Sequence, residues 1–258
     1  MQKSVLIVGY GNIGYYLSTE LSKLKPDIYD KYKTEFNTKR PIKYDFAFIC
    51  VDTPRIDANT PCDISAVKDA IQENDAKIYV LKSTVLQEQL KTIIEDGAKE
   101  GKTIIFSPEF YGTTQHCNNF GLDFTIIGGE KEACYELQQL LQEVYDGNHK
   151  FAVTDPITAC TVKYVDNMWI GWKLAYVFQV YDLCNKLGIH YEELRELWLL
   201  DKRVSRSMTY AYKDHDYWDS HCTSKDIPAE AETYKDVLPL VLDMIRYNFE
   251  RKDKKTEK

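Results

Sequence analysis

The chain has 258 residues and a mass of 30.0 kDa, enough for one large domain or two modest ones with an ample core. Its 44% hydrophobic and 28% charged residues are ordinary for a soluble globular protein. The net charge of −7, with no basic stripe along the chain, argues against nucleic acid or an anionic membrane as a partner.

Up to about residue 154, predicted strands alternate with predicted helices. The apolar run of residues 4–8 is typical of a buried parallel strand, and the helix after it places Ile13, Leu17 and Leu21 on one face. The alternation continues with strands at 28–29, 46–51, 77–81, 103–106 and 124–127 and helices at 64–71, 86–98 and 131–145. This order predicts an α/β fold with a doubly wound parallel sheet covered by helices on both faces.

From residue 155 the pattern becomes helical. One helix is predicted from residue 155 to Leu187, ending at Gly188, and residues 210–221 are typical of an aromatic loop. Asp226 and Pro228 are expected to open another helix, which Pro239 kinks or restarts. Residues 155–258 are therefore predicted to form a mostly helical second domain around one long central helix.

The segment Gly9-Tyr10-Gly11-Asn12-Ile13-Gly14 lies between the first strand and the first helix. In dinucleotide-binding proteins these glycines make a tight turn, let the backbone approach a pyrophosphate, and let helix and strand pack, while the helix N-terminus faces the phosphates. Asp30, sixteen residues after Gly14, can accept from both ribose hydroxyls, which favours NAD over NADP. The alternative is a glycine turn that only packs a helix, with Asp30 a surface acid. We predict an NAD-binding domain of the Rossmann type over residues 1–154.

Polar motifs follow three later strands at their carboxyl ends, where open parallel sheets bind ligands. They are Ile49-Cys50-Val51-Asp52-Thr53-Pro54, Lys82-Ser83-Thr84-Val85 and Ser107-Pro108-Glu109-Phe110. Taken singly, each motif is also explained as a polar turn after a strand. Taken with the glycine segment, they predict further contacts to the cofactor from Val51, Thr53, Ser83 and Thr84.

Further motifs follow in order along the chain. Lys163 and Asn167 lie on the long helix, and Asp201-Lys202-Arg203-Val204 and Cys222-Thr223-Ser224-Lys225-Asp226 come after it. The ordered set, from Val5 to about residue 226, resembles the UDP-glucose/GDP-mannose dehydrogenase family. Members of that family bind NAD, dimerise through a long central helix and oxidise a sugar C6 alcohol twice. The resemblance therefore implies a nucleotide-sugar-like substrate and a homodimer.

The resemblance also implies a role for each matching side chain. Cys222 matches the cysteine that forms a thiohemiacetal and a thioester with the substrate. Lys163 matches the lysine that stabilises the alkoxide, and Asn167 the asparagine hydrogen-bonded near the reacting carbon. The other matches are Thr84 and Glu109, which hold the hydrolytic water, Asp226, which supports proton transfer, Glu109 and Phe110 at the substrate, and Arg203, which reaches the sugar nucleotide of a neighbouring subunit.

The residue types are consistent with these roles. Lys163 and Asn167 are four apart on a helix and project from one face, and a cation beside a developing alkoxide stabilises the transition state. Near Cys222, the adjacent His221, Lys225 and a helix start could lower the pKa of the thiol. Each residue also has a structural interpretation: a buried cysteine, a solvated lysine, or Asp226 as a helix N-cap.

Several positions depart from the family pattern. Residues 213–221 are bulky and acidic where the family has a glycine-rich loop. Tyr111-Gly112-Thr113 follows Phe110 where a leucine, a basic residue and an acid are usual, and Cys160, Phe178-Gln179 and Asp52 also differ from the usual residues. The family's second Rossmann-like domain would begin near residue 258, so we expect a shortened member that lacks the domain gripping the nucleotide.

These departures leave two alternatives for the function. A 3-hydroxyacid-type NAD dehydrogenase also places a lysine and an asparagine four apart on its long helix and needs no cysteine. An NAD-binding sensor or subunit that has lost catalysis would explain the missing glycine loop and the missing domain.

The cysteines and the amino terminus indicate the compartment. Seven cysteines, an odd number without a Cys-x-x-Cys pair, argue against a disulfide framework and favour a reducing cytosol. The amino terminus runs directly into a strand, which leaves no room for a signal peptide, so we expect a cytoplasmic protein. A metal site is not expected, because the residues that could form one fit no zinc spacing: His116, Cys117, His215, His221 and Cys222.

Overall fold

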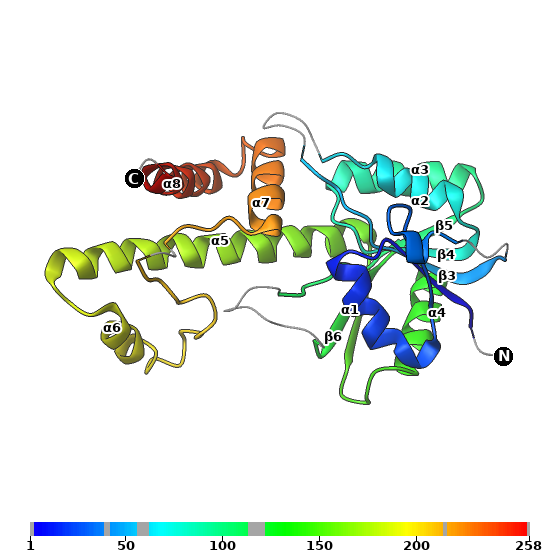
Figure 1. Cartoon of the computed structure of the whole chain (residues 1–258), viewed down its shortest axis with the longest axis horizontal. Helices are drawn as coiled ribbons and strands as arrows, with labels where there is room; N and C mark the ends of the chain where they lie inside the picture. The colour runs from blue at the N-terminus through cyan, green and yellow to red at the C-terminus, as the bar shows by residue number, and fades with distance from the viewer. Residues whose placement is uncertain (1–2, 39–41, 56–61, 113–121, 214–215, 257–258) are drawn as a thin grey trace. The chain divides into compact units, whose positions relative to one another are not determined.

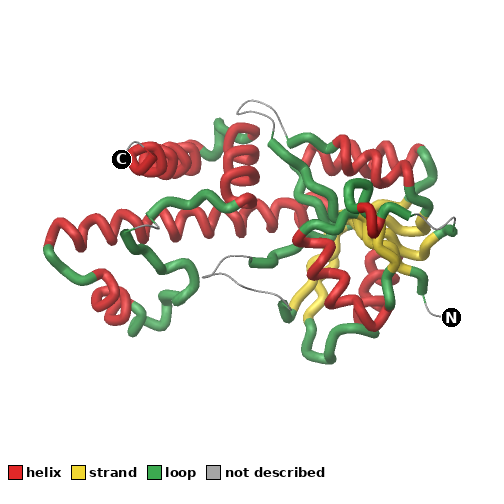
Figure 2. The backbone as a smooth tube through the Cα atoms, in the orientation of Figure 1, coloured by secondary structure: helices red, strands yellow, loops and turns green. Residues whose placement is uncertain are grey.

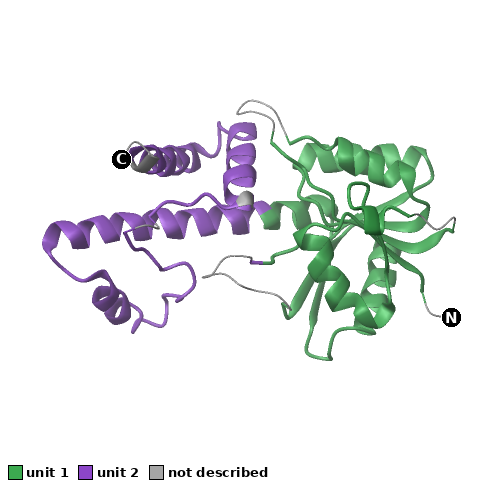
Figure 3. Ribbon diagram, viewed as in Figure 1, with its two compact units in different colours: residues 1–56, 61–111, 119–163 green, residues 57–60, 112–118, 164–258 purple. Residues whose placement is uncertain are grey.

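The computed structural model describes residues 3–38, 42–55, 62–112, 122–213 and 216–256. The chain divides into two compact units (Figure 3). Unit 1 consists of Met1–Ile56, Pro61–Tyr111 and Asn119–Lys163, and unit 2 of Asp57–Thr60, Gly112–Asn118 and Tyr164–Lys258. In the part of the chain that is described, all strands belong to unit 1 and unit 2 is helical (Figure 2). The domain boundary predicted at residue 154 stays a prediction.

Unit 1 is built on one sheet, with the strand order β2-β1-β3-β4-β5-β6-β7. The strands are β1 (Val5–Val8), β2 (Asp27–Tyr29), β3 (Tyr44–Ile49), β4 (Ala76–Leu81), β5 (Thr103–Phe106), β6 (Phe124–Gly128) and β7 (Lys150–Thr154). All neighbouring pairs are parallel except β5 and β6, which are antiparallel and joined by the single pair Phe106–Gly128. The predicted fold class is therefore confirmed, with one antiparallel step that apolar runs cannot reveal, because they carry no strand direction.

Helices cover both faces of this sheet (Figure 1). The helices are α1 (Asn12–Glu20), α2 (Ser65–Glu73), α3 (Gln87–Lys99) and α4 (Lys131–Gln142), with short 3₁₀ turns η1 (Leu21–Leu24) and η2 (Thr34–Phe36). Leu17 and Leu21 from α1 and η1 and Leu137 from α4 pack with Phe46 and Phe48 of β3 in one core. Burying side chains of this size stabilises the fold by roughly 1.5 to 3 kcal/mol each. This rigid layer fixes the sheet edge at which the predicted cofactor motifs lie.

Strand β7 is the one element of the sheet that the sequence pattern did not predict. It pairs in parallel with β6, so that β6, α4 and β7 form a further strand–helix–strand unit. Its five residues begin with an exposed lysine and are otherwise half-buried or exposed. A strand of this kind lacks the continuous apolar run by which buried parallel strands are recognised.

Unit 2 is organised around the long helix α5 (Pro156–Leu187), whose first turns belong to unit 1. Its other helices are α6 (Tyr191–Trp198), α7 (His221–Thr233) and α8 (Pro239–Thr256). Phe178 of α5 and Ile227 of α7 share a core with Met244 of α8. A Cβ atom at Gly171 would lie 2.9 Å from Ile227 and 3.1 Å from Met244, so this glycine permits the close packing. No helix in the described ranges is long and apolar enough to cross a membrane.

The helix ends test three predictions. Gly188 has a φ of +69° directly after α5, which confirms the predicted C-cap, and α8 restarts at Pro239 as expected. The prediction that Asp226 opens a helix as its N-cap is wrong. Helix α7 begins at His221, and its N-cap is Ser220, whose side chain accepts a hydrogen bond from the Thr223 backbone N–H. Pro228 suggested a helix start, but it lies inside α7.

Candidate functional site

The predicted cofactor motifs all follow strands at one edge of the sheet. Strands β1 to β5 are parallel, so the segments after them emerge at the same edge. The chain passes from β1 to β2 on one side and then to β3 on the other, which makes the gap beyond β1 and β3 the topological switch point. Open parallel sheets bind ligands at this point.

The three glycines after β1 differ in how much space a side chain would have at each position. Gly9 has a φ of +90°, and a Cβ there would lie 2.9 Å from the Cys50 backbone. A Cβ at Gly14 would lie 1.9 Å from the carbonyl oxygen of Gly9. A Cβ at Gly11 would meet nothing within 4 Å, although Gly11 is the N-cap of α1. The fold therefore needs Gly9 and Gly14, whereas the open backbone at Gly11 leaves space for a phosphate at the helix N-terminus.

Asp30 follows β2 and is held by backbone donors. Its Oδ2 accepts from the N–H of Tyr10 at 2.7 Å, and its Oδ1 accepts from the N–H of Tyr32 at 2.9 Å. A carboxylate has about four acceptor positions, so positions remain for ribose hydroxyls. Lys33 donates to the Tyr10 carbonyl at 2.6 Å and thereby steadies the same turn. The geometry after β1 and β2 thus fits a dinucleotide.

The predicted cofactor residues after β3 and β4 are brought together. The Ser83 hydroxyl donates to the Val51 carbonyl at 2.6 Å, and the Thr53 hydroxyl donates to the Thr84 carbonyl at 2.7 Å. These bonds join the two strand-end segments into one surface. The hydroxyl hydrogens of Ser83 and Thr53 are therefore used within the protein, and their oxygens keep acceptor capacity for a ligand.

A buried ion pair lies at the ends of β4 and β5. Lys82 Nζ lies 2.5 Å from Glu109 Oε1 and 3.1 Å from Ser107 Oγ, and the two ion-pair side chains are only 3% and 13% exposed. Burial raises the pKa of Glu109 above its ordinary value, although the charge of Lys82 opposes the rise. Lys82 and Ser107 were not predicted as site residues. The sequence signal that could have identified Lys82 is its position directly after the apolar strand β4. A lysine there begins at a buried backbone position, so its ammonium group needs a partner nearby.

Lys163 and Asn167 are both buried on α5, as their common face predicts. Within unit 1, Lys163 Nζ lies 5.0 Å from the centre of the Phe110 ring, a cation–π distance. Within unit 2, Asn167 Nδ2 donates to Asp226 Oδ2 at 2.9 Å. Lys225 Nζ lies 2.7 Å from the other oxygen of Asp226. The two predicted residues Asn167 and Asp226 are thus brought together in a buried polar pair.

Cys222 and Arg203 lie at the surface. Cys222 is exposed in the first turn of α7, four residues before the buried Asp226, so it is not the small buried hydrophobe of the structural interpretation. Arg203 is 90% exposed and makes a double hydrogen bond with Asp201. Both are accessible to a ligand. The meeting of Cys222 with Lys163, and the reach of Arg203 into a neighbouring subunit, stay predictions.

The bulky loop before α7 is anchored in unit 2. Trp218 is buried, and its backbone N–H and carbonyl both bond the Asn248 side chain at 2.8 Å. Arg251 lies 2.8 Å from Asp216 and also pairs with Asp182. The tryptophan therefore belongs to the core of unit 2, and part of the loop's negative charge is neutralised.

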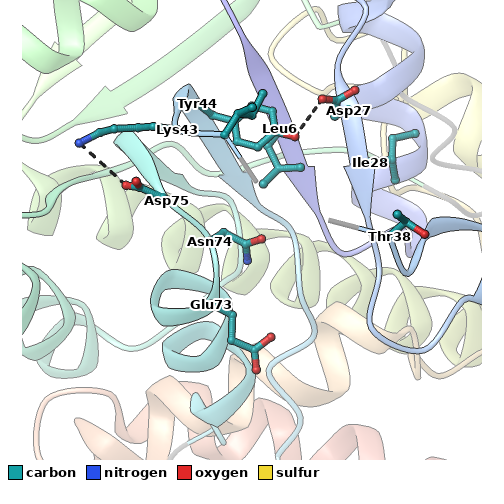
Figure 4. A pocket seen from close by; sticks show the side chains of 10 residues that line it. Leu6, Asp27, Ile28, Thr38, Lys43, Tyr44, Glu73, Asn74 and Asp75 are labelled. Carbon is teal, nitrogen blue, oxygen red and sulfur yellow. Dashed lines mark hydrogen bonds and ion pairs between the residues drawn. The ribbon is translucent and has the colours of Figure 1, made fainter. Parts of the chain in front are cut away.

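A different opening lies at the opposite edge of the sheet, at the amino ends of β1, β2 and β3 (Figure 4). Its volume is about 570 Å³, and its lining includes Asp27, Tyr44 and Asp75. Tyr44 donates to Asp27 at 2.8 Å, and Lys43 lies 3.9 Å from Asp75. Thr38 and Ile42, which also line it, flank positions outside the described ranges. None of the predicted site residues lies there.

A group of three or more residues able to hold a metal ion is not found within the described positions. His116, Cys117 and His215, considered as metal ligands from the sequence, lie outside the described residues.

The comparisons with known proteins agree with this architecture. The UDP-glucose/GDP-mannose dehydrogenase family matches in two parts, its NAD-binding domain over residues 16–148 and its central domain over residues 157–248. The chain belongs to this family. The glycine segment precedes the first match, so its geometry supports cofactor binding separately. NAD is the cofactor of the matched domain.

Similar proteins and solved structures show how much of the chain the similarity covers. The UDP-glucose 6-dehydrogenase of Rickettsia prowazekii is 26% identical over 238 residues, which cover 89% of this chain and 53% of that protein. A UDP-glucose dehydrogenase structure from Pyrobaculum islandicum aligns with a TM-score of 0.78 at 19% identity, over 96% of this chain and 68% of that one. The 3-hydroxyisobutyrate dehydrogenase of Mycobacterium tuberculosis aligns with a TM-score of 0.71 at 12% identity, over 95% and 91%. The chain spans about half the length of the curated relatives it matches.

Proposed function

We propose that the chain is an NAD-dependent dehydrogenase that oxidises a primary alcohol of a nucleotide sugar to a carboxylate through a thiohemiacetal on Cys222. Membership of the family and the names of the relatives support the substrate class. The observation that carries the proposal is the buried Asn167–Asp226 pair, one helical turn from the exposed thiol of Cys222 on α7. This arrangement leaves a nucleophile accessible beside a fixed carboxylate.

Each residue has a defined task in the proposed reaction. When bound, NAD accepts a hydride from the substrate carbon in each of the two oxidations. The ammonium group of Lys163 stabilises the negative charge on the substrate oxygen. The thiolate of Cys222 forms a C–S bond to the aldehyde carbon and holds it for the second oxidation, which leaves a thioester. Water, positioned by Thr84 and Glu109, then forms the new C–O bond, the C–S bond breaks, and Cys222 leaves as a thiolate.

The number of NADH molecules formed per UDP-glucose tests the covalent step. We expect two for the wild type and at most one for Cys222→Ala, because without the thiol the aldehyde is not held for a second oxidation. Glu232→Ala, an exposed change in the same helix α7, is the control and should still give two. Full formation of two NADH by Cys222→Ala contradicts the covalent step.

A second candidate is a 3-hydroxyacid-type dehydrogenase. The buried Lys163 and Asn167, four apart on α5, are the residues that this chemistry needs, and it needs no thiol. It predicts one NADH per 3-hydroxyacid in the wild type and no effect of Cys222→Ala. Calorimetric NAD binding without turnover of any alcohol offered would instead identify the chain as a sensor or subunit.

We also propose a homodimer formed through α5. Apolar side chains are exposed along this helix at spacings of three, four or seven residues: Val162, Val165, Trp169, Tyr176, Leu183 and Leu187. Such spacing makes a stripe that a second helix can cover. Trp169→Asp should therefore give a monomer in sedimentation velocity, whereas Asn185→Asp, an exposed change on the opposite side of α5, should not. A dimer that survives both changes would place the interface elsewhere.

We place the enzyme in the cytoplasm. The odd number of cysteines and the absence of a Cys-x-x-Cys pair support a reducing compartment. Retention of activity under thiol-reducing conditions is the expected result, and a requirement for oxidation would contradict it.

A further inference from the structure

A second carboxylate lies near Glu109 in unit 1. Glu20, the last residue of α1, accepts hydrogen bonds at its Oε2 from the Tyr111 hydroxyl at 2.7 Å and from the Tyr145 hydroxyl at 2.8 Å. The three side chains come from α1, from the segment after β5, and from the turn after α4. Two donors to one oxygen hold the carboxylate in a fixed position.

Glu20 and Glu109 line the same small cavity. Its volume is about 10 Å³, and Tyr111, Tyr145 and His149 contribute to its polar wall. This is close to the volume that a single water molecule needs. His149 stacks on Tyr145 with ring centres 4.0 Å apart and bonds the Thr125 hydroxyl at 2.9 Å, which fixes that side of the wall. The two carboxylates therefore line one cavity that has room for about one water molecule.

The charges around Glu109 nearly balance. Lys82 at the end of β4 and Lys163 on α5 supply two positive charges, and Glu20 on α1 supplies a negative one. The remaining titratable groups near Glu109 are Tyr111, Tyr145 and Cys50, together with His149, which lines the same cavity and whose pKa is lowered by burial. Burial raises the pKa of both tyrosines and brings that of Cys50 to about 12, so all three keep their protons at neutral pH. Without Glu20, two cations would surround the single carboxylate of Glu109.

We propose that Glu20 is a positioning residue for Glu109: fixed by Tyr111 and Tyr145, its negative charge offsets Lys82 and Lys163 and keeps Glu109 basic enough to take a proton from water. The inference rests on the proposed function, in which Glu109 holds the hydrolytic water. In that step an O–H bond of the water breaks, its proton moves to a Glu109 oxygen, and the hydroxide forms a C–O bond to the thioester carbon. Like charges on one cavity favour the protonated form of the acid, so Glu20 favours this transfer.

The test follows the titration of Glu109 directly. Glutamate carboxyl carbons labelled with ¹³C are observed by NMR against pH, and the Glu109 signal is assigned by its loss in Glu109→Gln. Glu20→Gln keeps an oxygen that accepts from both tyrosines but removes the charge. We expect the Glu109 titration to move to lower pH in Glu20→Gln, and in the same direction by less in Tyr145→Phe, where Glu20 loses one donor. Glu143→Gln, an exposed change of the same charge, should leave it in place.

The same variants are then compared in turnover. The acidic limb of the pH profile should move to lower pH in Glu20→Gln with little change in KM, which a purely structural defect would not produce. A Glu109 titration that is unchanged in both Glu20→Gln and Tyr145→Phe overturns the inference. A shifted titration in a protein that oxidises no nucleotide sugar upholds the coupling of the two carboxylates and contradicts the proposed function instead.

Discussion

The sheet edge of unit 1 and the α5–α7 helix pair of unit 2 place polar residues by different rules. At the sheet edge, each parallel strand delivers the residue after it to the same side of the molecule, as with Lys82 after β4 and Ser107 after β5. Between helices, the rotation of each helix decides which residues are buried. On α7 Asp226 is buried and Cys222, one turn earlier, is exposed. Strand-end motifs can therefore be located from topology alone, whereas helical motifs need the helix start as well.

The strongest test of the sheet edge is to remove one member of its buried ion pair. Glu109→Gln leaves the ammonium group of Lys82 buried without its carboxylate, so we expect a loss of about 3 kcal/mol in the free energy of unfolding. Urea unfolding followed by circular dichroism measures it. The double variant Lys82→Met/Glu109→Gln should recover part of the loss, because no uncompensated charge remains.

An exposed ion pair of similar length provides the control for that change. Lys77 and Glu136 lie 2.6 Å apart but are 52% and 34% exposed. Glu136→Gln should therefore cost less than about 1 kcal/mol. Equal losses for Glu109→Gln and Glu136→Gln would show that the pair at the sheet edge is solvated rather than buried.

In unit 2, the buried amide–carboxylate pair should matter more for folding than the thiol beside it. Asn167→Ala removes a donor to a buried carboxylate, for which we expect a loss of about 2 kcal/mol. Cys222→Ser, an exposed change, should stay within about 0.5 kcal/mol of the wild type. Thermal unfolding of the two variants compares them. If Cys222→Ser were the more damaging change, Cys222 would have a structural role that its exposure does not suggest.

The sequence allowed more of unit 1 than of unit 2 to be predicted. Gly9 and Gly14 could be placed because they lie between the first strand and the first helix, although the backbone that crowds Gly9 is that of the distant Cys50. Asp30 could be placed because it directly follows the second strand. The partners Lys82 and Glu109 are 27 residues apart, so their pairing depends on which strands are neighbours. Glu20 meets Tyr145 over 125 residues, and nothing near Glu20 marks it. In unit 2, Pro228 led to a predicted helix start that is too late, and for the same reason Asp226 was wrongly expected to be the N-cap.

A smaller loss than those of Glu109→Gln and Asn167→Ala is predicted at the start of α5, the helix that carries both Lys163 and Asn167. Asp155 precedes the helix, and its Oδ1 accepts from the Thr158 backbone N–H at 2.9 Å. Hydrogen bonds from the Thr158 side chain and backbone lower the pKa of Asp155, so its stabilisation is present above the unfolded pKa of about 3.9 and is lost as the pH falls through the lower folded value. Asp155→Ala should cost about 0.5 to 1 kcal/mol at pH 7, since solvent screens an exposed cap, and the cost should vanish in acid. Asp123→Ala, exposed and 3.8 Å from Lys150, is the control. Hydrogen exchange should show the added fraying near Lys163 rather than near Asn167, because the loss of a cap acts within the first turns; equal exchange at both positions would mean that α5 opens as one unit.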